Sequence, residues 1–211
     1  MSRRLLAGAG LAAAAAAAWW LTDSAPYPYA QRALLDIPLP FLTNRRLDAL
    51  LGARPGERVL EIGPGTGLQA LHVARHLGPS GRLDVVDIQQ AMLDCVMRRA
   101  DARDIGGIVP ARADARQLPF ADGSFDAAYL VTALGEIPDQ LAVLRELRRV
   151  LRPEGRLVVG EFFDRHYVPL VTLLRYANVS GFEPATHLGC PVAYLARLRP
   201  VPSQAGDTRA S

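Results

Sequence analysis

Three glycines alternate with other residues directly after a short apolar stretch, in the sequence VLEIGPGTG that begins at residue 59. Gly63, Gly65 and Gly67 can take positive φ angles and let a ligand approach the backbone, and the N–H groups of a helix that starts there are free. A loop for a dinucleotide pyrophosphate usually has its third glycine one residue later, where this chain has Leu68. The carboxylate of Glu61 would repel a pyrophosphate and attract a cation. The motif therefore favours a ligand that carries a positive charge.

Two further acids follow apolar stretches later in the chain. Asp87 comes about 20 residues after the glycines, where an acid can accept hydrogen bonds from both ribose hydroxyls. Ile88 could then pack on the face of an adenine, and Asp114 with Ala115 could accept the adenine amino group. Each acid alone could be a surface or capping residue, but together they predict a nucleoside pocket with an anionic rim.

The elements that must position these residues alternate regularly. The expected strands span residues 58–63, 82–88, 107–114, 124–134 and 156–163. The expected helices span residues 67–78, 89–100, 139–151 and 168–181, with a turn at 152–155 and a closing antiparallel strand pair at 183–189 and 192–198. Single helices between strands imply right-handed crossovers and a doubly wound α/β sheet, whose ligands bind at the carboxyl ends of the strands.

These stretches together resemble the class I S-adenosylmethionine-dependent methyltransferases, in particular the small-molecule group (methyltransferase type 11) that includes ubiquinone and menaquinone methyltransferases. The resemblance covers roughly residues 45–198, through VLEIGPGTG, VVDIQQAML, ADARQLPFADGSFDAAYLVTALGEIPD and LRELRRVLRPEGRLVVGEF. The chain departs from the group at Glu154, where relatives usually have glycine. The resemblance implies a seven-stranded, mostly parallel sheet whose last strand is antiparallel.

The resemblance also implies the cofactor and its contacts. S-adenosyl-L-methionine would donate a methyl group to a small, hydrophobic or lipid-like acceptor. Its methionine part is assigned to Glu61, Gly63, Gly65, Thr66 and Gly67, its ribose to Asp87 beside Ile88, and its adenine to Asp114 and Ala115. This assignment agrees with the charge argument, since the sulfonium of the cofactor is a cation.

The acceptor side of the reaction is less defined by the sequence. The methyl group of a sulfonium is already activated, so the protein mainly has to align the acceptor. An oxygen or ammonium acceptor would also need a general base. Glu136, Asp164 and His166 are the candidates, and Gly135-Glu136 stands where relatives often carry a Glu-His or His-His pair. Whether oxygen, nitrogen or carbon is methylated stays open.

The composition of the chain outside this domain indicates three further segments. Residues 5–21 are apolar and follow Arg3 and Arg4, which favours a membrane anchor for a cytoplasmic enzyme over an export signal or a mis-assigned start. Residues 22–44 contain four prolines and form an expected linker and lid, while 199–211 form an expected disordered tail. The aromatic side chains of the linker could cover the acceptor, pack in the core or face a membrane; they are Tyr27, Tyr29 and Phe41.

Composition excludes several other classes of protein. The net charge is +3 and the basic residues are scattered, which argues against nucleic-acid binding. Cys95 and Cys190 lack a CxxC partner, so we expect two reduced core thiols and no metal. Two alternatives remain: a non-catalytic methyltransferase-like binding protein, and an NAD-dependent oxidoreductase, which the glycine spacing opposes. The sequence leaves the oligomeric state open.

Overall fold

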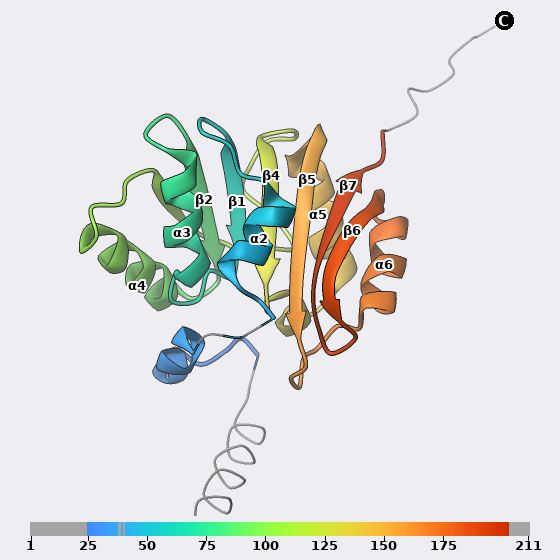
Figure 1. The fold of residues 1–211 in the computed structure, drawn as a ribbon, viewed down its shortest axis with the longest axis horizontal. Coiled ribbons are helices and arrows are strands. Elements are labelled where there is room, and N and C mark those ends of the chain that lie inside the picture. Colours follow the sequence, from blue (N-terminus) through green and yellow to red (C-terminus); the bar gives the residue numbers. More distant parts are fainter. Residues whose placement is uncertain (1–24, 38, 40, 203–211) are drawn as a thin grey trace, which may run out of the picture.

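One seven-stranded sheet forms the centre of the computed structural model, which describes residues 25–37, 39 and 41–202 (Figure 1). The strands are β1 (Arg58–Ile62), β2 (Arg82–Asp87), β3 (Ile108–Arg112), β4 (Phe125–Val131), β5 (Leu151–Phe162), β6 (Phe182–Cys190) and β7 (Ala193–Pro200). Their order is β3-β2-β1-β4-β5-β7-β6; β1 to β5 pair in parallel, and β7 runs antiparallel to both of its neighbours. The predicted doubly wound sheet with an antiparallel last strand is therefore confirmed.

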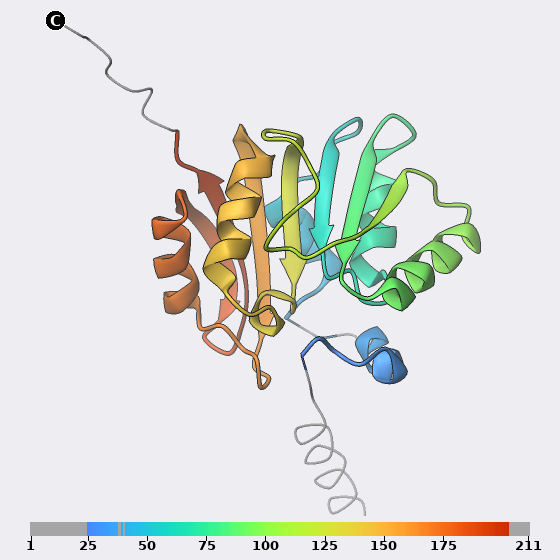
Figure 2. The same cartoon turned by 180° about the vertical axis from the view of Figure 1, so that it is seen from behind.

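Helices cover both faces of this sheet. They are η1 (Tyr29–Asp36), α2 (Asn44–Leu51), α3 (Leu68–Leu77), α4 (Gln90–Asp101), η2 (Leu134–Glu136), α5 (Gln140–Val150) and α6 (Leu170–Val179). Helices α2, α3 and α4 lie on the face seen in Figure 1, and α5 and α6 lie on the opposite face, seen in Figure 2. Alternate residues of β1 serve the two faces, because Val59 packs with the first helix group and Leu60 with the second.

Two strand boundaries differ from those expected from the sequence. The expected turn at 152–155 is part of β5, but the pairing with β4 jumps from Leu151 to Arg156, so these four residues form an irregularity within the strand. Strand β4 ends at Val131, three residues early, because Thr132 takes a positive φ of 54° and η2 follows. Both differences arise from local backbone geometry that the apolar pattern does not encode.

The chain changes direction across the sheet at β1. It builds outward from β1 to β2 and β3, and then returns to add β4 on the other side. This change of order opens a crevice at the carboxyl ends of β1 and its neighbours. The short helix η1 lies across these ends, below the sheet in Figure 1.

The remaining sequence predictions concern the two ends of the chain and the two cysteines. The apolar segment 5–21 and most of the expected tail lie outside the described residues. Among the residues that the structure describes, no helix is long and apolar enough to cross a membrane. Cys95 is a buried free thiol as expected, whereas Cys190 is free but only half-buried at the end of β6.

Candidate functional site

A cavity of about 280 Å³ opens where four strands end. Its lining includes the last residue of β1, β2, β4 and β5, namely Ile62, Asp87, Val131 and Phe162. Of the predicted site residues, the cavity is lined by Gly63, Gly65, Thr66, Asp87, Ile88, Asp114, Ala115, Glu136 and Asp164. The structure thus brings together residues that are spread over about 100 positions of the sequence, from Gly63 to Asp164.

The glycine loop turns β1 into α3 with three left-handed residues. The φ angles of Gly63, Gly65 and Gly67 are 65°, 53° and 85°, a region that strains other residue types. A Cβ on Gly63 would also lie 2.7 Å from the Cβ of Ala133, and one on Gly65 would lie 3.1 Å from Leu35. Gly67 caps α3 and does not line the cavity. The loop therefore brings its backbone close to the cavity at Gly63 and Gly65.

Glu61 lies beneath this loop without lining the cavity. Its side chain is buried on β1, next to Tyr129 on β4. Burial, and secondarily the charge of Asp87, raises the pKa of Glu61 to about 8. Its Oε2 atom has no hydrogen-bond partner among the described residues. A buried carboxyl with unused acceptor capacity would be stabilised in its charged form by a nearby cation.

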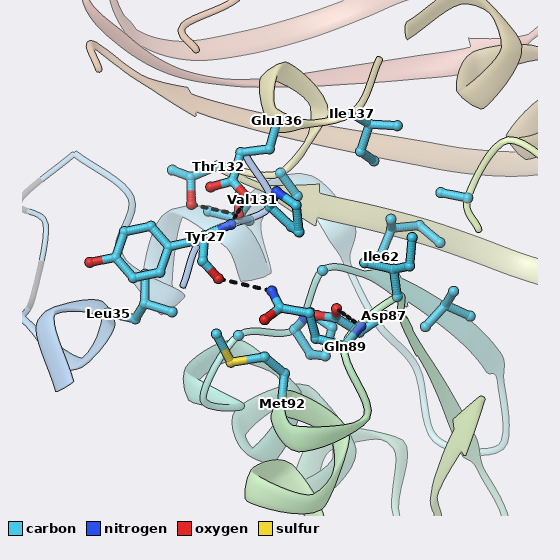
Figure 3. Close-up of a pocket in the computed structure, with 18 of the residues that line it drawn as sticks. Tyr27, Leu35, Ile62, Asp87, Gln89, Met92, Val131, Thr132, Glu136 and Ile137 are labelled. Atoms are coloured by element: carbon cyan, nitrogen blue, oxygen red, sulfur yellow. Dashed lines mark hydrogen bonds between the residues drawn. The ribbon is translucent and has the colours of Figure 1, made fainter. Parts of the chain in front are cut away.

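Asp87 and Ile88 present a polar and an apolar surface side by side. The Oδ1 atom of Asp87 accepts a hydrogen bond of 2.8 Å from the backbone N–H of Gln89, which fixes the carboxyl group (Figure 3). Burial raises the pKa of Asp87 above its usual value. Ile88 is 52% exposed although it is apolar, which is the environment expected of a side chain that packs on a ligand ring.

Asp114 is held by a neighbouring arginine. Its carboxylate forms a 2.6 Å ion pair with Arg116, which keeps the pKa of Asp114 below its usual value. The adjacent Ala115 is buried against the core. Asp114 can therefore still accept a hydrogen bond, but part of its acceptor capacity is used by Arg116.

A segment that we call the lid, residues 26–36, is tied to the cavity at both ends. The backbone N–H of Tyr27 donates to Glu136 Oε2 over 2.9 Å, and the Gln89 side-chain amide donates to the Tyr27 carbonyl over 2.8 Å (Figure 3). At the other end, Asp36 Oδ1 accepts hydrogen bonds of 2.7 Å from the Thr66 hydroxyl and the Arg99 guanidinium. The lid thus connects the loops after β1, β2 and β4.

Some of the predicted residues have contacts that differ from those expected from the sequence. Thr66 was expected at the methionine part, but its hydroxyl is used by Asp36 of the lid. Tyr27 is buried and lines the cavity. Phe41 is 39% exposed, stacks near Arg46 and does not line the cavity.

The three candidate bases lie close together but differ in environment. Glu136 accepts a hydrogen bond from the lid backbone. The Oδ1 atom of Asp164 accepts a 2.8 Å hydrogen bond from the backbone N–H of His166. His166 does not line the cavity, and its buried Nε2 atom has no hydrogen-bond partner among the described residues. A Cβ on Gly135 would collide with the carbonyl oxygen of His166, so the glycine at this position lets the two loops touch.

Glu161, near the end of β5, is an acid that the sequence reasoning missed. It is buried, and its Oε1 atom has no hydrogen-bond partner among the described residues. Burial, followed by the charge of Asp164, raises the pKa of Glu161 to about 8. The available signal was an acid inside an apolar strand, VVGEFF, the same signal that singled out Glu61.

Comparisons with known proteins agree with this geometry. Residues 59–155 match the family described as "Methyltransferase domain". A ubiquinone/menaquinone biosynthesis C-methyltransferase (UbiE) from Vibrio vulnificus is 38% identical over 122 residues, which cover 56% of this chain and 46% of that protein. The chain thus spans about half the length of the curated relatives it matches.

Solved structures share the fold at lower sequence identity. A SAM-dependent methyltransferase from Aquifex aeolicus superimposes with a TM-score of 0.76 at 16% identity, over 83% of this chain and 100% of the other. The [4+2]-cyclase SpnF superimposes with a TM-score of 0.68 at 21% identity, over 75% of this chain and 80% of the other. Residues 59–155 are therefore similar to the methyltransferase domain family, and the chain shares the fold of solved S-adenosylmethionine-dependent methyltransferases that its motifs predicted.

Proposed function

We propose that this protein transfers the methyl group of S-adenosylmethionine to a small, hydrophobic acceptor. The observation that carries the proposal is the cavity that the glycine loop and Asp87 line at the carboxyl ends of β1 and β2, with the buried Glu61 one residue before the end of β1. The family match over residues 59–155 supports the same reaction class.

The residues present fit this cofactor. The Gly63–Gly67 backbone would hold the methionine part, with the unused acceptor capacity of Glu61 beneath it. Asp87 would accept hydrogen bonds from the ribose hydroxyls, and Ile88 would pack on the adenine. When bound, the cofactor supplies a methyl group on a sulfonium, which needs no further activation because a neutral thioether leaves. The protein has to exclude water and align the acceptor, which is catalysis by proximity.

The other part of the cavity is apolar, which supports a hydrophobic acceptor. The lid and the segment after it contribute Leu34, Leu35, Ile37 and Leu39 to the lining. The V. vulnificus relative is named for ubiquinone and menaquinone biosynthesis, and a quinone precursor is a flat, apolar ring that suits such walls. We therefore propose a quinone-like or lipid-like acceptor.

Methylation of a neutral acceptor must also release one proton. Glu136 and Asp164 line the cavity and could accept that proton directly. The Nε2 atom of the half-buried His166 has no hydrogen-bond partner among the described residues and could receive the proton in a second step. For an activated carbon acceptor the base would act after the methyl transfer, and for a hydroxyl it would act during the transfer.

A second candidate function is a methyltransferase-like protein that binds the cofactor without transferring its methyl group. The specific observation is that a [4+2]-cyclase shares this fold, because the fold alone does not determine the reaction.

The experiment that separates the two candidates uses S-adenosylmethionine with a labelled methyl group and a panel of quinols, phenols and amino-lipids. Label in the acceptor, lost in the Asp87→Ala variant, supports transfer. Tight cofactor binding by calorimetry without label in any acceptor would favour the binding protein. Absence of binding would reject both candidates.

The location of the protein is also a proposal. Residues 5–21 carry the sequence-based hypothesis of a membrane anchor that would keep the enzyme near a lipid-like acceptor. Fractionation of cells that express the full chain, or a version starting at Thr22, tests it. Membrane recovery of the full chain alone is the expected result, and recovery of both versions in the soluble fraction would contradict it.

A further inference from the structure

Two histidines and an aspartate meet on the outer face of α2 and α3, apart from the cavity described above. His72 and His76 are four residues apart on α3, so they lie on the same side of that helix. Asp48 on α2 faces them, and one ligand atom from each of the three side chains lies within 4.8 Å of the others. From this arrangement we infer a surface binding site for a divalent transition-metal ion.

The contacts of His76 favour metal binding. Its Nδ1 atom is 2.9 Å from the backbone carbonyl oxygen of His72. A carbonyl oxygen can only accept a hydrogen bond, so the proton of the neutral ring is on Nδ1. The lone pair of Nε2 is then available for a metal. Histidines that bind metals usually donate their other ring nitrogen in this way, which fixes the orientation of the ring.

The contacts of His72 place the second nitrogen beside the carboxylate. Its Nε2 atom is 2.8 and 2.9 Å from the two oxygens of Asp48. Without a metal this contact is an ordinary hydrogen bond, and a metal ion would take the place of the shared proton. The rings of His72 and His76 are tilted by 51° with centroids 4.5 Å apart, so both can face one point.

The site needs only a small adjustment to reach metal geometry. Two ligands of a tetrahedral zinc ion, each about 2.0–2.1 Å from the metal, are about 3.4 Å apart. The separations here run from 2.8 Å for Asp48 to His72 up to at most 4.8 Å across the cluster, so the longest one has to shorten by at most about 1.4 Å. The Asp48 side chain is 40% exposed and His76 is exposed, so both can rotate without disturbing the core.

The donor set selects the class of metal. Two imidazole nitrogens and one carboxylate oxygen suit Zn²⁺, Ni²⁺ or Cu²⁺, whereas Mg²⁺ and Ca²⁺ prefer oxygen ligands only. The metal would connect α2, which follows the lid, to α3, which starts at the glycine loop. This inference does not depend on the proposed methyl transfer, because its ligands are separate from the cavity.

The test is a calorimetric titration of ZnSO₄ into tag-free, chelator-stripped full-length protein, with MgCl₂ as a negative control. We expect one Zn²⁺ per chain, an at least tenfold weaker affinity in His72→Ala, His76→Ala and Asp48→Asn, and unchanged affinity in His187→Ala. His187 is a matched control because it is also exposed and lies on β6.

The melting temperature is a second readout, which distinguishes loss of the metal site from a general loss of stability in a variant. Zn²⁺ should raise the melting temperature of the wild type and of His187→Ala, but not that of His76→Ala, whose exposed side chain is not needed for folding. Absence of Zn²⁺ binding by the wild type, or binding that is unchanged in both His72→Ala and His76→Ala, would overturn the inference.

Discussion

Buried carboxyl groups dominate the chemistry of this site at the scale of single residues. Glu61 and Glu161 are both buried, and each keeps an oxygen atom without a hydrogen-bond partner among the described residues. Removal from water raises the pKa of each to about 8, against 4.5 for an exposed glutamate. Such groups are costly for folding, and a shifted pKa near a cavity makes both residues candidates for a functional role.

This cost predicts a pH-dependent stability. Between pH 4.5 and 8 the unfolded chain releases these protons while the folded protein retains them, so rising pH favours unfolding by on the order of a few kcal/mol per group. The wild type should therefore lose stability from pH 5 to pH 8. Glu61→Gln should show a weaker pH dependence and be at least as stable as the wild type at pH 8.

Urea unfolding at several pH values measures this effect. Glu161→Gln gives an independent repeat with the same expected sign, since the pKa of Glu161 is raised in the same way. Equal pH dependence in the wild type and both variants would show that neither carboxyl group holds a proton in the folded protein.

Gly135 illustrates a single residue whose role is purely steric. A Cβ at this position would collide with the carbonyl oxygen of His166, which is backbone and cannot move aside cheaply. We expect Gly135→Ala to lower the free energy of unfolding by about 1–3 kcal/mol, the usual cost of overpacking. Gly106→Ala is the matched control, because no atom lies within 4 Å of its added Cβ. Similar melting temperatures for the two variants would contradict the described packing of the loops.

At the scale of elements, the lid is the feature that organises the cavity. It is joined to the glycine loop through Asp36 and Thr66, and to the loops after β2 and β4 through Tyr27. A ligand in the cavity lies beneath this segment, since both the lid and the strand ends line it. We therefore expect the exchange of a ligand to involve the opening of some of these hydrogen bonds.

The lid predicts an effect on ligand exchange. Asp36→Ala removes the acceptor shared by Thr66 and Arg99, so S-adenosylmethionine should dissociate several-fold faster, as measured by stopped-flow fluorescence. Stability should change by less than about 1 kcal/mol, because the ion pair is partly exposed. Asp122→Ala is the control, since Asp122 also pairs with an arginine, Arg149, but does not line the cavity. Equal dissociation rates in both variants would contradict a role of the lid in cofactor exchange.

The elements themselves were largely predictable, and their mutual contacts were not. Buried parallel strands and amphipathic helices repeat along the chain, so their order follows from local patterns. The contacts of the lid join residues that are 30 and 109 positions apart, as in Asp36 with Thr66 and Tyr27 with Glu136. No local pattern encodes such pairs, and the Asp48–His72 contact was missed for the same reason.

At the scale of the whole molecule, topology explains why the site is where it is. The reversal of strand order at β1 creates the crevice, and the ends of four strands bring their last residues to it. The position of the cavity could thus be predicted from the order of elements. The acceptor could not be predicted in this way. The remaining walls of the cavity come from the lid and from loops whose sequences follow no general pattern. In addition, a cyclase shares the fold, so the fold alone does not determine the reaction.

Calorimetric titration of S-adenosylmethionine into the full-length protein tests the central claim most directly, that the cavity at the ends of β1, β2 and β4 holds this cofactor. We expect one binding site per chain, weakened about 10- to 100-fold in Asp87→Ala through loss of charge-assisted hydrogen bonds. Affinity should be unchanged in Asp101→Ala, which removes an exposed acid at the end of α4. Absence of binding by the wild type, or equal affinity in wild type and Asp87→Ala, would contradict the assignment of the cavity.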